Sequence, residues 1–66
     1  MNDLIEDNLI AIRDRLLAFY SPAEADVWLH TPHPQLGGAT AFDTIEAGRA
    51  AKVYAVLDRL ESGAYL

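Results

Sequence analysis

The sequence predicts a small all-α domain of about four helices, with long first and last helices and two short helices between them. Three observations support this prediction. Apolar residues recur at steps of three and four near both ends of the chain, which is the period of an amphipathic helix. Helix-capping residues precede the two short segments. No stretch of useful length alternates apolar and polar residues as a strand would.

The first helix is expected over residues 2–20, which contain no Gly or Pro. Asn2 or Asp3 would cap it, and the early acids match the positive end of the helix dipole. Ile10 and Leu17 lie on a second apolar stripe, about 120° from the first. Either another helix of the domain covers this second stripe or a second subunit does, so both residues are candidates for a dimer interface. The main stripe comprises Ile5, Leu9, Ile12, Leu16, Phe19 and Tyr20.

The second helix is expected from Pro22 to about His30. Ser21 stands three residues before Glu24, which is the spacing of a capping box, and Pro22 occupies the first helical position, where its missing N–H is harmless. The side chains expected to face the core are Ala23, Val27, Trp28 and Leu29.

Residues 28–38, WLHTPHPQLGG, are interpreted as a joint between helices. Pro32 and Pro34 interrupt the helix, and Gly37 and Gly38 permit positive φ angles. Trp28 is interpreted as a core anchor, because neighbouring helices can bury all of its side chain except the indole N–H. Structural roles are assigned to Trp28, Leu29, Pro32, Leu36, Gly37 and Gly38.

The third helix is expected over AFDTIEA, residues 41–47, with Thr40 as its N-cap and Gly48 ending it in a left-handed conformation. The last helix should run from Arg49 to about Ser62 and end at Gly63. Its core stripe consists of Val53, Val56, Leu57 and Leu60. The apolar Tyr65 and Leu66 follow, either packed back on the domain or offered to a partner.

Size and charge narrow the function. A 66-residue chain buries only about 60 % of the surface that its unfolded form exposes, and with no cysteine it lacks disulfides, so we expect association with another chain. Ten acidic residues against five basic ones oppose direct nucleic-acid binding and favour a basic partner protein or cleft. No signal peptide or membrane-spanning run is evident, so we expect a cytoplasmic protein without a membrane role.

Catalytic and metal sites are disfavoured. His30 and His33 are separated by Pro32, and no third zinc ligand has an obvious position. A triad using Ser21 or Thr31 would need an orienting group and an oxyanion site, which so short a chain can hardly enclose. The stretch AGRAAK, residues 47–52, lacks the second glycine and the strand of a phosphate loop. We therefore expect no enzyme activity and no cofactor, with a small metal or nucleotide module as the weakest alternative.

The sequence from Trp28 onward resembles the toxin-binding domain of the Xre/MbcA/ParS antitoxins. In that family Trp-Leu is followed by a Thr-Pro turn, Leu-Gly-Gly, a Thr-led short helix, Gly and a Val-x-x-x-Leu helix. The resemblance covers roughly residues 16–65, with His33 in place of the usual Asn and Ala41 in place of the usual Pro. The matching residues are Trp28, Leu29, Thr31, Pro32, Leu36, Gly37, Gly38, Thr40, Gly48, Val53, Leu57 and Gly63.

The resemblance implies a non-catalytic domain of a bacterial toxin–antitoxin system, which neutralises a toxin, commonly of the NAD-consuming RES class. In the family the C-terminal part obstructs the active-site cleft of the toxin, and that role would fall here on the last helix and tail. We expect a single domain of residues 1–66, dimeric as in the family, without an N-terminal DNA-binding helix-turn-helix domain. The candidate toxin-binding residues are Lys52, Tyr54, Arg59, Glu61, Gly63, Tyr65 and Leu66, with Tyr65 as the expected hot spot.

A rival hypothesis belongs to another functional class. The chain would then be the dimerisation module of a transcriptional regulator, with Ile10 and Leu17 as its interface and no direct catalytic or DNA-binding role.

Overall fold

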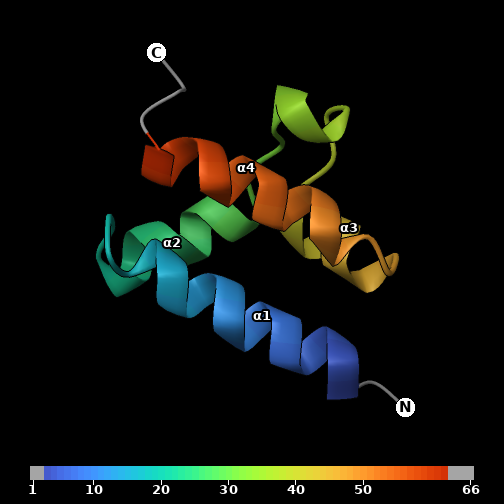
Figure 1. Cartoon of the computed structure of the whole chain (residues 1–66), viewed down its shortest axis with the longest axis horizontal. Helices are drawn as coiled ribbons and strands as arrows, with labels where there is room; N and C mark the ends of the chain where they lie inside the picture. Colours follow the sequence, from blue (N-terminus) through green and yellow to red (C-terminus); the bar gives the residue numbers. More distant parts are fainter. Residues whose placement is uncertain (1–2, 63–66) are drawn as a thin grey trace.

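The computed structural model describes residues 3–62, and within them it contains four α-helices and no strand. The helices are α1 (Asp3–Leu16), α2 (Pro22–Leu29), α3 (Ala41–Glu46) and α4 (Ala50–Ser62), with a 3₁₀ turn, η1 (Pro34–Leu36), between α2 and α3. Figure 1 shows that α1 and α4 run in the same direction, so both helices end on the same side of the molecule. The predicted all-α fold with long outer and short inner helices is confirmed.

Helix α1 ends at Leu16, four residues earlier than the sequence predicts. The amides of Ala18 and Phe19 bond to carbonyls three residues back, which tightens the chain into a turn. Pro22 holds Ser21 in an extended conformation with ψ 163°, so the chain could not continue as a helix through Ser21. Phe19 is therefore 49 % exposed, and its predicted place in the core stripe is wrong.

Helix α2 begins with the predicted capping box. The Ser21 amide donates to Glu24 Oε1 over 2.9 Å, and the Glu24 amide donates to Ser21 Oγ over 3.3 Å. The predicted inward face is wrong for Ala23 and Val27, which are exposed, Val27 by 65 %. The helix instead buries Ala25 and Leu29.

The segment between α2 and α3 folds back on itself. Gly37 and Gly38 adopt φ angles of 70° and 86°, which the sequence anticipates there. An antiparallel bridge pairs Pro32 with Thr40, and the His33 amide donates to the Ala39 carbonyl over 3.1 Å. The segment is thus a closed loop that returns the chain to the start of α3.

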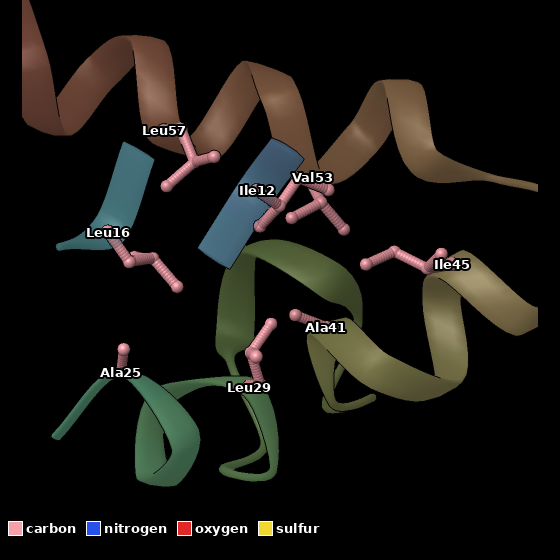
Figure 2. Packing of buried hydrophobic residues seen from close by; sticks show 8 residues of the cluster. All are labelled: Ile12, Leu16, Ala25, Leu29, Ala41, Ile45, Val53 and Leu57. Carbon is pink, nitrogen blue, oxygen red and sulfur yellow. The ribbon is translucent and has the colours of Figure 1, made fainter. Parts of the chain in front are cut away.

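All four helices contribute to one core, and each supplies two residues that are four apart. Residues at this spacing lie on the same face of a helix, so each helix presents one narrow apolar edge. Figure 2 shows these side chains pointing toward one another. The pairs are Ile12 and Leu16, Ala25 and Leu29, Ala41 and Ile45, and Val53 and Leu57.

Candidate functional site

The candidate toxin-binding residues of α4 lie on two different flanks of the helix. Lys52 and Arg59 are seven residues apart, about two turns, and therefore share one flank. Tyr54 and Glu61 each come two residues later, which turns them about 200° around the axis. The core edge of α4 lies between the two flanks. One flat partner surface therefore cannot meet all four side chains at once.

The flank with Tyr54 and Glu61 faces α1. Arg15 of α1 donates from Nε to Glu61 Oε2 over 2.9 Å and from one Nη to Glu61 Oε1 over 2.8 Å. The same Nη donates to Asp58 Oδ1 over 2.8 Å. The guanidinium lies 5.7 Å from the centre of the Tyr54 ring, and the Tyr54 hydroxyl donates to Asn8 Oδ1 over 3.1 Å. We call this set of five residues the α1–α4 clamp.

Electrostatics within the clamp favour the charged forms. The hydrogen bond from Arg15 holds the pKa of the Glu61 carboxyl below its ordinary value. The hydrogen bonds to Glu61 and Asp58 in turn raise the pKa of the Arg15 guanidinium. Both acids of this flank therefore pair with a cation within the chain, although two carboxylates share one guanidinium.

The opposite flank of α4, together with Arg49 just before the helix, is basic and forms no such ion pairs. Arg49, Lys52 and Arg59 form no ion pair with any residue in the described range 3–62, whereas Arg13 pairs with Asp26 and Arg15 with the clamp acids. These three residues, all exposed, are the basic flank. A hollow of about 270 Å³ at the start of α4 includes Arg49 and Lys52 in its lining, together with Asp43. An acidic protein thus presents its uncompensated positive charge along one helix.

The remaining candidate contacts of the tail are Gly63, Tyr65 and Leu66. They lie outside the described residues.

The second apolar stripe of α1 faces outward. Ile10 is 57 % exposed and Leu17 is 38 % exposed, so no described helix covers them. Arg13, between them in sequence, pairs with Asp26 of α2 over 3.0 Å. The sequence allows two kinds of cover for this stripe, another helix of the domain or a second subunit. Among residues 3–62, no other helix of the domain covers it.

The family model of the antitoxin Xre/MbcA/ParS C-terminal toxin-binding domain matches residues 17–63, more than half of the chain. The chain belongs to this family. No curated protein and no solved structure matches it. The match begins one residue after α1 ends, so it covers α2, η1, α3 and α4. Helix α1 lies outside the match, yet it completes the core of this antitoxin domain with Ile12 and Leu16.

The joint residues of the antitoxin domain occupy defined places. Leu29 is buried, Leu36 and Trp28 pack half-buried against the core, and Gly48 ends α3 with a φ of 80°. Trp28 also contacts His33, whose ring centre lies 4.4 Å from the Trp28 ring centre.

Both histidines of the joint bond to the backbone. His33 Nε2 lies 3.0 Å from the Trp28 carbonyl oxygen, and His30 Nδ1 lies 2.9 Å from that of Asp26. A carbonyl oxygen only accepts, so each of these nitrogens carries the proton. The rings thereby serve as local caps of α2. Within residues 3–62 no group of three or more His, Cys, Asp or Glu side chains is placed to hold a metal.

An apolar groove on α2 was missed by sequence reasoning. It has a volume of about 380 Å³ and exists because α2 carries apolar residues on two faces, only one of which enters the core. That double-sided pattern was the signal that could have revealed it. The groove is lined by Tyr20, Ala23, Glu24, Val27, Trp28, Thr31 and His33.

None of the described helices is long and apolar enough to cross a membrane.

Proposed function

We propose that this antitoxin domain neutralises a cognate toxin of the RES type, an NAD-consuming enzyme, by covering its active-site cleft with the end of α4 and residues 63–66. The observation that carries the proposal is the match to the toxin-binding family over residues 17–63. Occlusion needs shape and charge rather than catalytic groups, in keeping with a binding role in the bacterial cytoplasm.

The charge distribution supports α4 as the toxin-facing helix. The side chains of its basic flank are exposed and form no ion pair within residues 3–62. Lys52 and Arg59 are therefore available to bind acidic groups beside the toxin cleft. The clamp acids are already paired with Arg15 and have less to offer a partner. Of the earlier candidates on α4 we therefore rank the basic-flank residues above Tyr54 and Glu61. Tyr65 remains our expected hot spot, because a tyrosine combines a large rigid surface with one hydrogen bond.

Co-expression with the toxin encoded by the neighbouring gene tests the proposal. The intact chain should restore growth and preserve cellular NAD, whereas the chain ending at Ser62 and the Tyr65→Ala variant should do so poorly. Leu4→Ala, which shortens a side chain that is 77 % exposed at the start of α1, on the side of the molecule away from the end of α4, serves as the control. Equal rescue by the shortened chain would refute occlusion by the tail. Rescue without any effect on NAD would refute the RES assignment.

We further propose that the domain forms a homodimer through the outward stripe of α1, because Ile10 and Leu17 are apolar and uncovered. Analytical ultracentrifugation should show a dimer for the parent and a monomer for Ile10→Asp and Leu17→Asp. Ala11→Asp places the same carboxylate at an exposed position that lies about 100° around the helix from Ile10, and should leave the dimer intact. If the monomeric variants still bind toxin, dimerisation and toxin binding use separate surfaces. A parent chain that sediments as a monomer would contradict this proposal.

A further inference from the structure

We infer that Arg15 is a positioning residue, which fixes the last turn of α4 so that the chain leaves the domain toward the toxin from a defined place. This inference rests on the proposed function, since it takes the toxin contact to follow α4. It concerns a residue that lies before the family match, which starts at Leu17.

The last turn of α4 buries little of its own surface. Val53, Val56 and Leu57 are buried, but beyond Leu57 no described residue of the helix is buried, and Leu60 is the one that is half-buried. A terminal helical turn without buried side chains opens readily. Arg15 bonds to Asp58 and Glu61 of this stretch, and so contacts a segment in which Leu60 alone packs against the core.

Arg15 is itself well anchored. The next residue, Leu16, has no exposed surface, and Ile12, three residues before Arg15, is equally buried. The side chain of Arg15 is only 30 % exposed. The backbone that carries Arg15 is therefore held against the core.

The geometry of the Arg15–Glu61 contact restricts the orientation of the Glu61 carboxylate as well as its distance from Arg15. Nε and one Nη of Arg15 meet both oxygens of Glu61, over 2.9 and 2.8 Å, and a planar fork of this kind restricts rotation of the partner. About two turns before Glu61, the Tyr54 ring lies against the same guanidinium and its hydroxyl bonds to Asn8. Helix α4 is thus attached to α1 at two successive levels.

Fixing this turn before binding has a consequence for affinity. A segment that is already ordered loses less conformational entropy when it docks, so a partner binds it more tightly. If the turn were loose, toxin binding would have to order it. Arg15 would then contribute to toxin affinity without touching the toxin.

Arg13 provides a matched control. It lies on the same helix, is also exposed in part, and also forms an ion pair, but with Asp26 of α2 instead of α4. Arg15→Gln should weaken binding of the cognate toxin about tenfold, as expected for lost pre-organisation. Arg15→Lys should recover only part of this loss, because a lysine cannot form the fork. Arg13→Gln should bind the toxin like the parent.

Hydrogen exchange of the free chain gives a second readout that does not involve the toxin. In Arg15→Gln the amides of residues 60–62 should exchange faster while those of α3 are unchanged, and in Arg13→Gln both should match the parent. If Arg15→Gln fails to fold, Glu61→Gln replaces it, since it breaks the fork and keeps the side-chain shape. Equal exchange and affinity in the two arginine variants would overturn the inference. A parent chain that binds no toxin overturns the proposed function, whereas the exchange comparison still decides whether Arg15 holds the turn.

Discussion

At the residue scale, Gly48 shows most directly how one residue type sets the course of the chain. It follows α3 with a φ of 80°, in the left-handed region that residues with a Cβ atom avoid. A Cβ placed on Gly48 would meet no atom within 4 Å. The requirement for glycine at this position is therefore a matter of backbone conformation alone.

Gly48→Ala is accordingly expected to destabilise the domain by about 1 kcal/mol, the strain of one left-handed alanine. In a domain of this size that corresponds to a fall in Tm of roughly 4–8 °C. Gly48→Asn should lower the Tm less than Gly48→Ala does, since asparagine tolerates the left-handed region better. Thermal unfolding followed by circular dichroism checks both variants. An unchanged Tm for Gly48→Ala would mean that the turn can reach another conformation.

At the element scale, α2 marks the limit of what its own sequence could predict. The start of the helix followed from local chemistry, because Ser21, Pro22 and Glu24 are adjacent and their capping bonds involve no distant residue. The buried face of the helix did not follow from local chemistry. Ala23 and Val27 have the same spacing of four as Ala25 and Leu29, so both pairs satisfy a helical period. The choice between the pairs depends on α1 and α3, with which α2 packs.

The burial of α2 can be tested with one substituent at two positions. Val27→Lys should change the free energy of unfolding by no more than about 0.5 kcal/mol, because the side chain is 65 % exposed. Ala25→Lys, two residues earlier, should unfold the domain, because Ala25 has no exposed surface and no partner for a buried ammonium. Urea denaturation of the two variants gives the answer. If Val27→Lys unfolds the domain, Val27 faces the core, as the sequence suggested.

The contact between α1 and α4 should make stability depend on pH. Arg15 lowers the pKa of Glu61 from its ordinary value of 4.5 in the folded state, so folding favours the carboxylate. The resulting stabilisation is complete above about pH 4.5 and is lost as the pH falls through the lower folded pKa. Glu24, held by the Ser21 amide, acts in the same direction.

Measured between about pH 3 and pH 7, the Tm of the parent should therefore fall on the acid side. In Glu61→Gln the fall should be smaller, because one of the two carboxyls that link folding to deprotonation is gone. Asp14→Asn, which changes an exposed acid of α1 that takes part in no ion pair of the described residues, provides the control. Identical acid profiles for the parent and Glu61→Gln would show that the clamp does not couple to stability.

At the scale of the whole molecule, the division of charge explains which features of the site were predictable. Charges are visible in the sequence, so the acidic balance and the shared flank of Lys52 and Arg59 could be anticipated. Arg15 and Glu61 are 46 residues apart, and only the parallel course of α1 and α4 brings them together. In the sequence Glu61 therefore looked available to a partner, whereas in the folded chain its carboxylate already binds Arg15.

The basic flank yields a prediction for the assembled toxin complex. Lys52→Gln with Arg59→Gln should slow association with the toxin about tenfold at low salt, if these cations steer the domain toward acidic groups on the toxin. Two exposed alanines, one in α1 and one in the turn after it, provide a control with the same change in net charge, through Ala11→Glu with Ala18→Glu. Stopped-flow association rates at increasing salt would compare the pairs. The difference should disappear at about 1 M salt, where screening acts within a few ångströms. Equal slowing by both pairs would mean that net charge, rather than the basic flank, governs the encounter.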